Sequence, residues 1–210
     1  MTYRDRRAAG AVLAERLAQY AGRDDVVVLG LVRGGLPVAA EVAHRLDVPL
    51  DALMVRKLGV PWAPEVAFGA VGPHGVRVLN QEIVSRLPPG AVSAVVHAES
   101  AELARREHRY RAARPPLDLT GRVALLVDDG LATGASARAA VAVARGLGAS
   151  RVVVAVPVGA REAVAHLAAE ADEVVCPWQP ADFGAVSRFY DDFGQVPDAE
   201  VVSLLAASDG

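Results

Sequence analysis

Apolar residues along this chain fall into two patterns, short and nearly unbroken runs and longer segments in which they recur every three or four positions. The short runs have strand length and lie at 26–32, 50–55, 123–127, 151–158 and 173–176. Helical spacing appears between them, at 5–20, 38–46, 137–147 and 161–169. Unbroken apolar runs are typical of strands that are covered on both faces of a parallel sheet. Their alternation with helices predicts an α/β fold, with a Rossmann-like parallel sheet flanked by helices and joined by right-handed crossovers.

The stretch from residue 58 to residue 113 departs from that alternation. Residues 58–75 hold three prolines and four glycines, and short apolar runs on either side of 72–75 predict a hairpin. A short helix is expected at 80–87 and a charged helix at 98–113. The charged helix spaces glutamate and arginine at i,i+4, as in Glu102 with Arg106, which is typical of a solvated surface rather than a basic ligand site.

Composition limits the class of protein. A chain of 210 residues suits one domain, here expected over 1–210, and 52% of its residues are hydrophobic. No apolar run reaches the length of a membrane-spanning helix, and the amino terminus lacks the unbroken apolar segment of a signal peptide. A cytoplasmic protein without a membrane partner is therefore expected. A net charge of −3 gives no basic field for a nucleic acid.

The most informative stretch is 123–136, which reads VALLVDDGLATGAS. Its apolar strand ends at Asp128 and Asp129, and ligands of open α/β sheets bind at that end of the strands. The following loop offers backbone N–H groups, two hydroxyls and a helix start, which favour a phosphate. Carboxylates accept hydrogen bonds from sugar hydroxyls, so the stretch predicts a ribose 5-phosphate site. The alternative, a buried strand followed by a helix N-cap, explains the hydroxyls but not two adjacent acids.

Apolar residues, two acids and then Ala-Thr-Gly-x-Ser resemble the signature for 5-phosphoribosyl 1-pyrophosphate (PRPP) of type I phosphoribosyltransferases. The resemblance implies that Asp128 and Asp129 hold the ribose hydroxyls and take part in catalysis. It implies a loop for the 5-phosphate made of Ala132, Thr133, Gly134, Ala135 and Ser136. It also implies Mg²⁺, bound mainly through PRPP oxygens because this cation prefers oxygen ligands. The flexible flap and the C-terminal hood of the family would correspond here to about 58–79 and 177–197.

A second glycine loop follows the first apolar run. Arg33, Gly34 and Gly35 stand between that run and a helical pattern, so backbone could approach a ligand closely and the helix start would favour an anion. A tight turn between strand and helix would also account for the two glycines. In the family the corresponding loop holds the pyrophosphate of PRPP. Some members have a non-proline cis peptide there, and the sequence leaves open whether one lies near Arg33.

Arg56 and Lys57 follow the second apolar run. A charge pair at a strand exit is by itself typical of a solvated surface. This one resembles the Arg-Lys pair that binds pyrophosphate in the orotate and adenine phosphoribosyltransferases. Arginine can bind phosphate oxygens bidentately while lysine adds a point charge, so the resemblance implies that both stabilise the charge growing on the leaving group.

Aromatic residues concentrate near the carboxyl terminus, where 178–193 holds five of the ten in the chain. One interpretation is an acceptor pocket in the hood, in which one ring stacks on the acceptor. Its candidate residues are Trp178, Phe183, Phe189 and Tyr190. The other interpretation is a small satellite core that closes the end of the sheet. The segment also resembles, more loosely, the C-terminal segment of 6-oxopurine phosphoribosyltransferases, whose metal-assisting aspartate aligns with Asp192.

The resemblance implies transfer of the 5-phosphoribosyl group from PRPP to a nitrogenous acceptor, with a nucleobase expected, and release of pyrophosphate. The acceptor subfamily stays unassigned, because Ala132 stands where the 6-oxopurine enzymes carry an acid. A non-catalytic PRPP-binding regulatory protein is the alternative. A hydrolase or phosphotransferase is disfavoured because the sequence has no Walker loop or nucleophile motif. Assembly into a homo-oligomer is left open.

Overall fold

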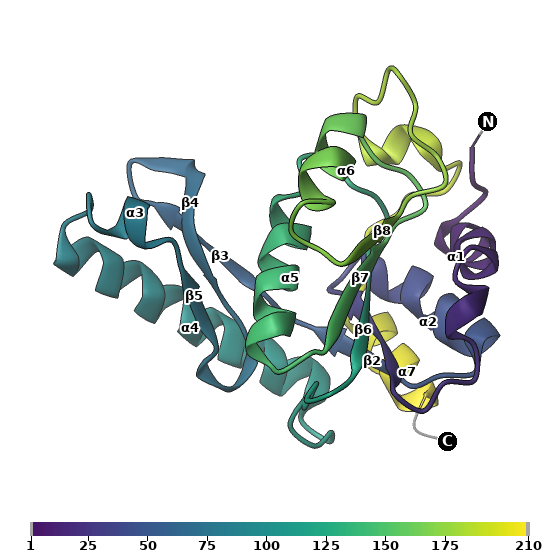
Figure 1. Ribbon diagram of the computed structural model, residues 1–210. Coiled ribbons are helices and arrows are strands. Elements are labelled where there is room, and N and C mark those ends of the chain that lie inside the picture. The colour runs from purple at the N-terminus through teal and green to yellow at the C-terminus, as the bar shows by residue number, and fades with distance from the viewer. Residues whose placement is uncertain (1, 209–210) are drawn as a thin grey trace.

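A five-stranded parallel sheet forms the centre of the molecule in the computed structural model, which describes residues 2–208 (Figure 1). Every neighbouring pair of its strands runs parallel. The α/β fold predicted from the alternation of apolar runs and helical spacing is therefore confirmed. From one edge to the other, the strands are β2 (Leu50–Leu53), β1 (Val26–Leu31), β6 (Val123–Val127), β7 (Arg151–Ala155) and β8 (Glu173–Val175).

The direction in which the sheet grows reverses between β1 and β6. The chain leaves β1 toward one edge, at β2, and later returns to β6 on the other side of β1. The pairing of β1 with β6 extends to Gly30 opposite Val127, so the two strands end side by side. In open α/β sheets the crevice beyond such a reversal receives the ligand. The fold therefore favours a site between the loops that follow β1 and β6.

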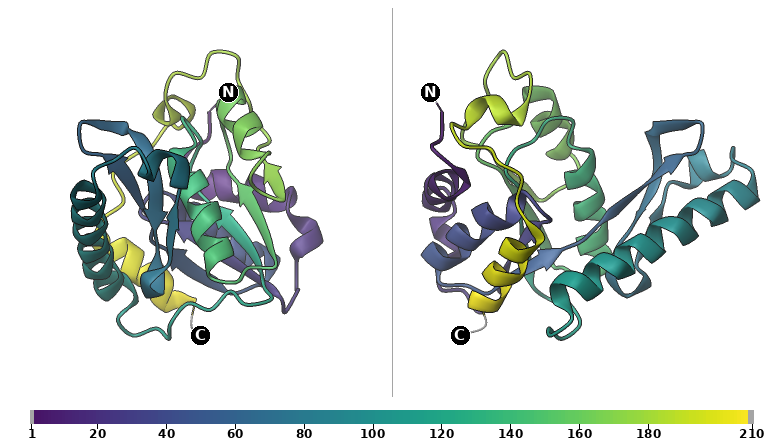
Figure 2. Two further views of the ribbon diagram at one scale, coloured as in Figure 1. Left: turned by 60° about the vertical axis from the view of Figure 1, so that its left-hand side comes forward. Right: turned by 180° about the vertical axis from the view of Figure 1, so that it is seen from behind.

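Helices cover both faces of this sheet (Figures 1 and 2). Alternate residues of a strand point to opposite faces, so Leu125 of β6 belongs to one core cluster and its neighbour Leu126 to another. None of the helices within 2–208 is both long and apolar enough to cross a membrane. The first face is covered by α1 (Arg6–Glu15), the turn η1 (Ala18–Tyr20), α2 (Gly35–Leu46) and α7 (Asp198–Ala207), and the second by α5 (Ala135–Gly146) and α6 (Arg161–Leu167).

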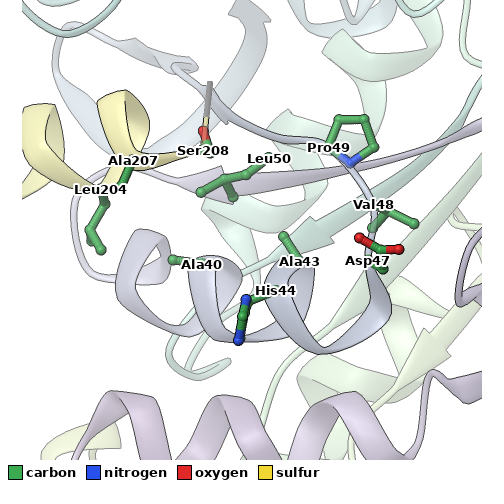
Figure 3. Close-up of a pocket in the computed structure, with 10 residues that line it drawn as sticks. All are labelled: Ala40, Ala43, His44, Asp47, Val48, Pro49, Leu50, Leu204, Ala207 and Ser208. Carbon is green, nitrogen blue, oxygen red and sulfur yellow. The ribbon is translucent and has the colours of Figure 1, made fainter. Parts of the chain in front are cut away.

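Helix α7 packs beside α2, a contact that the sequence pattern did not predict. Between the carboxyl-terminal halves of these helices lies a groove of about 620 Å³, to which His44 and Leu204 contribute (Figure 3). The groove also includes Leu50, the first residue of β2. It therefore lies at the amino end of the sheet, away from the loops that follow β1 and β6.

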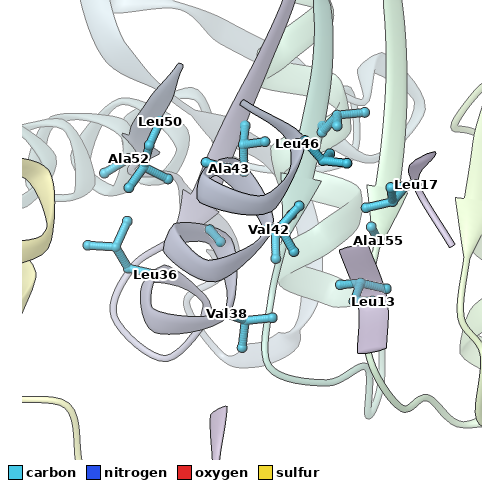
Figure 4. Packing of buried hydrophobic residues seen from close by; sticks show 14 of the residues in the cluster. Leu13, Leu17, Leu36, Val38, Val42, Ala43, Leu46, Leu50, Ala52 and Ala155 are labelled. Carbon is cyan, nitrogen blue, oxygen red and sulfur yellow. The ribbon is translucent and has the colours of Figure 1, made fainter. Parts of the chain in front are cut away.

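Aliphatic side chains fill the core between the sheet and α2 (Figure 4). Ala39, Val42 and Leu46 recur at helical spacing on the buried face of α2. Leu13 of α1 and Ala52 of β2 are fully buried in the same cluster. The apolar faces that the sequence predicts for the first two helical segments thus both face the sheet.

A second, antiparallel sheet of three strands projects from the main one together with a long helix, and we call this part the arm (Figure 1, left). The hairpin predicted around 72–75 is confirmed, since β4 and β5 pair antiparallel on either side of it. Phe68 of β4 is fully buried in a small core shared with Val96 of the long helix. The arm consists of β3 (Arg56–Val60), β4 (Ala63–Val71), η2 (Pro73–Gly75), β5 (Arg77–Leu79), α3 (Gln81–Val84) and α4 (Pro89–Arg111).

Two boundaries in the arm differ from the sequence expectation. Arg56 opens β3 instead of following directly on a strand of the main sheet, because the pairing with β1 stops at Leu53. Helix α4 begins at Pro89, well before the expected start at 98. A proline in the first turn suits a helix start. The residues that follow it are mostly apolar, however, and carry none of the charged pairs that mark the rest of the helix.

A buried ion pair joins the arm to the main sheet. Arg111, at the end of α4, donates two hydrogen bonds of 2.8 Å to the carboxylate of Asp51 in β2. The Arg111 side chain is 5% exposed and that of Asp51 14%. Burial raises the pKa of Asp51, but the adjacent Arg111 guanidinium outweighs it and leaves the pKa below its usual value. A terminal nitrogen of Arg114 lies 3.2 Å from the same carboxylate, so the joint is a small charge cluster.

Replacing Asp51 by asparagine should destabilise the protein by about 3–5 kcal/mol, because the buried guanidinium of Arg111 loses its counter-charge. Urea denaturation measures the free energy of unfolding. Glu82→Gln is the control, since Glu82 pairs with Arg86 on the exposed surface, where ion pairs contribute little. Equal losses in the two variants would contradict the role of Asp51 as an anchor for the arm.

Candidate active site

The acid pair at the end of β6, Asp128 and Asp129, is the chemical centre of the candidate site. Asp128 accepts a hydrogen bond of 2.8 Å from the backbone N–H of Asp129. Asp129 accepts one of 2.9 Å from Nε of Arg6, at the start of α1. The side chains of Arg6 and Asp129 are only 12% and 14% exposed. The two carboxylates therefore differ, because Asp129 has a buried cationic partner whereas Asp128 forms no ion pair with any residue from 2 to 208.

Burial and the neighbouring Asp129 carboxylate raise the pKa of Asp128 well above its usual value of 3.8. Burial also raises the pKa of Asp129, although Arg6 opposes that effect. Two carboxylates this close titrate as a pair, so ionisation of both costs free energy. Hydroxyl donors from a ligand would reduce that cost.

The loop that follows β1 lies directly against the acid pair. Its Val32–Arg33 peptide is cis, a feature that the sequence had left open. A Cβ atom on Gly34 would collide with the carboxylate of Asp129, and one on Gly35 would lie 2.5 Å from a backbone carbonyl oxygen of β6. Glycine at 35 is therefore required by the close approach of the β6 backbone, whereas a side chain at 34 would displace the Asp129 carboxylate.

These two loops and the start of α5 line a cavity of about 230 Å³. Apolar residues at the ends of β1 and β2, among them Leu31 and Leu53, form one side of it. The structure thus brings together members of three groups that the sequence singled out separately. They are Arg33 and Gly34, Asp128 and Asp129, and Ser136.

The predicted phosphate loop, 132–136, leads from β6 into α5. Gly134 is the N-cap of that helix and has a φ of 79°, a left-handed conformation that favours glycine. Ala132, Thr133 and Ser136 are exposed, and the Thr133 hydroxyl accepts a hydrogen bond of 3.4 Å from the backbone N–H two residues later. A glycine N-cap provides no side-chain acceptor, so N–H groups at the start of α5 are suited to an anion.

Arg56 and Lys57 lie on opposite faces of β3, as neighbours in a strand do. Arg56 donates from Nε to Glu99 of α4 at 2.6 Å. Lys57 lines a groove of about 480 Å³ between the arm and α5, which also includes Ala135. Neither side chain lines the cavity of the acid pair. In this conformation the two side chains therefore do not point toward one leaving group, because they lie on opposite faces of β3 and Arg56 is paired with Glu99.

Arg33 is held by the first turn of α7. One of its terminal nitrogens lies 3.5 Å from Oδ1 of Asp198. Asp198 also accepts a hydrogen bond of 2.5 Å from the Tyr110 hydroxyl and pairs with Arg109, both near the end of α4. One carboxylate thus links the loop after β1 to α7 and to the arm.

The hood closes the carboxyl end of the main sheet and contains the short helix η3 (Val186–Phe189). Its half-buried Trp178 packs edge-on against Phe189, with ring centroids 4.8 Å apart. The buried rings of the hood share one cluster with Tyr3 of the N-terminal segment. These rings are Phe183, Phe189 and Tyr190.

The hood aromatics therefore form a satellite core, and the expectation that Phe189 or Tyr190 stacks on an acceptor is not supported by the structure. Both rings are covered, with Phe189 7% and Tyr190 6% exposed. Tyr3 forms a β-bridge with Tyr190 and so lays the N-terminal segment against the hood. Because the covering segment comes from the opposite end of the chain, the local excess of rings could not reveal it.

Asp192 is exposed and accepts a hydrogen bond of 3.2 Å from the backbone N–H of Gly194. It lines a groove of about 430 Å³ together with residues of α1 and α7, rather than the cavity of the acid pair. Within 2–208, no three metal-ligating side chains are grouped to hold an ion. The geometry therefore adds no support to the looser resemblance of Asp192 to a metal-assisting aspartate.

Two residues that the sequence did not single out stand at the site. Arg6 reaches Asp129 across 123 positions of the chain, and Asp198 reaches Arg33 across 165. Arg6 belongs to a charged stretch typical of a helix start, and Asp198 begins a segment for which the sequence predicted no element. No local pattern separates either residue from an ordinary surface charge.

Comparison with known proteins agrees with the class that the fold and the acid pair define. The sequence profile described as the phosphoribosyl transferase domain matches residues 4–193. That range includes the acid pair, the glycine loop after β1 and the phosphate loop. The chain belongs to the phosphoribosyltransferase family.

Individual relatives agree with this assignment. A Mycobacterium tuberculosis H37Rv protein, provisionally named a phosphoribosyl transferase, is 55% identical over 203 residues, which cover 96% of this chain and 46% of that protein. The chain thus spans about half the length of this relative. The crystal structure of TT1426 from Thermus thermophilus covers 100% of both chains with 48% identity and a TM-score of 0.93. The bifunctional protein PyrR of Chloroflexus aurantiacus is 31% identical over 49% of this chain and 53% of its own length.

Truncation of a buried hood ring should destabilise the protein without a selective loss of substrate affinity. Phe189→Ala is expected to lower the free energy of unfolding by about 3–5 kcal/mol, as in other packed cores. Trp62→Ala is the control, because Trp62 is 66% exposed between β3 and β4 and should change stability little. Urea denaturation and calorimetry with PRPP and an acceptor measure the two effects. Weaker acceptor binding at unchanged stability would restore the stacking interpretation.

The raised pKa of Asp128 predicts a pH-dependent gain in stability for Asp128→Asn. The folded state binds the Asp128 proton more tightly than the unfolded chain does, so stability is lost as the pH rises above about 3.8. At pH 7 the variant should be more stable by about 0.5–2 kcal/mol, and the gain should vanish below about pH 4. Thermal unfolding at the two pH values measures the difference.

Asp129→Asn is the contrasting variant for this prediction. It removes the counter-ion of the buried Arg6, so it should not stabilise the protein at neutral pH. An Asp128→Asn variant that is no more stable than the wild type at pH 7 would show that the charge on Asp128 does not destabilise the folded protein.

Proposed function

We propose that this protein transfers the 5-phosphoribosyl group of PRPP to a nitrogenous acceptor, with a nucleobase as the expected acceptor, and releases pyrophosphate. The observation that carries the proposal is the cavity in which Asp128 and Asp129 meet the glycine loop after β1 and Ser136 at the start of α5. The carboxylates can accept hydrogen bonds from the ribose hydroxyls. Backbone N–H groups at the start of α5 can bind the 5-phosphate, and those of the glycine loop can bind the pyrophosphate. Membership of the family supports the same substrate.

In the proposed reaction the acceptor nitrogen attacks C1 of the ribose, and the proton that this nitrogen loses is released to solvent with the products. The bond between C1 and the pyrophosphate oxygen breaks, and the configuration at C1 inverts. Asp128 and Asp129 accept hydrogen bonds from the ribose hydroxyls, and their negative charge stabilises the cation that develops on the ring. Thr133, Ser136 and the first N–H groups of α5 hold the 5-phosphate.

The leaving pyrophosphate is assigned to the loop after β1. Gly34 and Gly35 keep its backbone close to the acid pair, and the loop opens α2, whose N-terminus favours an anion. Arg33 lines the same cavity and supplies a positive charge beside the departing oxygen. Its contact with Asp198 is long and partly exposed, so a phosphate could compete for the guanidinium.

The arm is proposed to supply the flap, residues 58–79, that closes over PRPP. An oxocarbenium-like transition state is intercepted by water unless water is excluded, so a cover of this kind serves the chemistry. Lys57 lines the groove that also includes Ala135 at the start of α5, so closure of the arm is proposed to bring it toward a phosphate. Arg56 would first have to exchange Glu99 for a phosphate oxygen. We therefore propose that Lys57 contacts a phosphate when the arm closes. Arg56 would do so only after it has released Glu99.

Magnesium fits this site through the substrate. The acids of the cavity present carboxylate oxygens, which are the hard donors that suit this cation, and they hold the ribose hydroxyls beside it. The ion would be bound mainly by PRPP oxygens, with Asp128 and Asp129 orienting the sugar. When bound, it neutralises charge on the pyrophosphate and makes that group a better leaving group.

A second candidate is a PRPP-binding regulatory protein without catalysis. The observation that favours it is the position of Arg56 and Lys57, which lie outside the cavity of the acid pair. A protein that only binds PRPP needs the acids and the phosphate loop but no groups that stabilise a leaving pyrophosphate. The two functions therefore share the binding site and differ in turnover.

Binding of PRPP tests what both candidates share. Asp128→Asn with Asp129→Asn should weaken PRPP binding by roughly ten-fold to a hundred-fold, because charge-assisted hydrogen bonds to the ribose hydroxyls contribute about 1–3 kcal/mol each. Calorimetry with Mg²⁺ and PRPP measures the affinity. Asp25→Asn is the control, since Asp25 precedes β1 at the amino end of the sheet and pairs with Arg23. Equal affinities in the wild type and the double variant would refute the proposed site.

Release of pyrophosphate, followed across a panel of nucleobases with Mg²⁺ and PRPP, then separates the enzyme from the regulator. Product formation with one base supports the transferase, and the Asp128→Asn, Asp129→Asn double variant should lack it. Tight PRPP binding with no turnover across the panel would favour the regulatory protein.

A further inference from the structure

Arg6 is held at the site by three kinds of contact. Its Nε donates to Oδ2 of Asp129 at 2.9 Å, and a terminal nitrogen donates to the carbonyl oxygen of Gly194 at 2.8 Å. Its guanidinium carbon lies 4.0 Å from the centre of the Phe193 ring, which is a cation–π contact. An arginine with a carboxylate, a carbonyl and a ring as partners is fixed in one orientation.

The contacts continue from Phe193 back to the acid pair. The Phe193 ring packs against Tyr190 with centroids 5.0 Å apart. The Tyr190 hydroxyl donates a hydrogen bond of 2.5 Å to the backbone carbonyl oxygen of Asp129. Arg6, Phe193 and Tyr190 thus form a continuous set of contacts around Asp129. Arg6 binds its side chain and Tyr190 binds its backbone.

An ordinary packing role does not explain this arrangement. Arg6 and Asp129 are both largely removed from water, and buried charges are unfavourable unless they are well paired. Apolar residues would dock α1 on the hood at lower cost. The cation instead contacts one of two adjacent carboxylates and so reduces their mutual repulsion before any substrate binds.

We propose that Arg6 is a positioning residue, which fixes the Asp129 carboxylate for the ribose hydroxyls and couples this acid to the hood. The inference rests on the proposed PRPP site. The backbone of Gly34 also lies close to this carboxylate, so the loop after β1 and Arg6 both restrict the position of Asp129. The ribose site is complete only when α1, the acid pair and the hood segment 190–194 are docked together.

The test compares Arg6→Ala, Arg6→Lys and Arg7→Ala with the wild type by calorimetry with Mg²⁺ and PRPP. Arg6→Ala should weaken PRPP binding at least ten-fold. Arg6→Lys should recover part of the loss, because lysine restores the charge but not the planar fork. Added guanidinium ion, well below concentrations that unfold the protein, should restore affinity in Arg6→Ala. Arg7→Ala is the matched control and should bind as the wild type does, because Arg7 lies in the same helical turn with an exposed side chain.

Hydrogen exchange without ligand provides a second measurement. Arg6→Ala should exchange faster at 128–130 and 190–194 and be unchanged elsewhere. Equal PRPP affinity in Arg6→Ala and the wild type would overturn the proposal. Weaker binding with faster exchange throughout the molecule and no rescue by guanidinium would overturn it as well. A wild type that fails to bind PRPP would contradict the proposed function instead, and the exchange comparison would then decide whether Arg6 fixes Asp129.

Discussion

Two adjacent carboxylates at the end of a buried strand are the constraint on which the rest of the site depends. Charge in such a place is tolerated only where neighbours supply donors or counter-charge. The neighbours approach from different parts of the fold. The guanidinium of Arg6 comes from α1 and pairs with the Asp129 carboxylate, and the glycine loop after β1 leaves the room that this carboxylate occupies. The hydroxyl of Tyr190 comes from the hood and donates to the backbone carbonyl oxygen of Asp129. Elements from three parts of the chain therefore meet at these acids.

The features that sequence alone could predict are those encoded within one short segment. The strand, the acids and the phosphate loop all lie within 123–136, and the left-handed turn at Gly134 needs glycine whatever surrounds it. The parallel sheet was equally predictable, because strands buried on both faces must be apolar at every position. Local chemistry therefore identified the fold class and, among the residues that line the cavity, Arg33, Gly34, Asp128, Asp129 and Ser136.

The remaining features depend on segments that are far apart in the chain. An amphipathic pattern shows that one face of a helix is buried but not what covers it, so the pairing of Arg6 with Asp129 had no local signal. The hood rings illustrate the same limit, because Tyr3 decides whether they form a pocket or a core. Arg56 and Lys57 were adjacent in sequence, yet strand geometry sends them to opposite faces.

The close approach of Gly34 to Asp129 restricts how this site could drift over evolutionary time. A side chain at 34 would have to displace the carboxylate of Asp129, which Arg6 also holds. A substitution at 34 is therefore expected to be accepted only together with a change at 129. Paired changes are rarer than single ones. The ribose end of the cavity is thus expected to evolve slowly, whereas the arm, which makes no such contact with Asp129, is freer to vary.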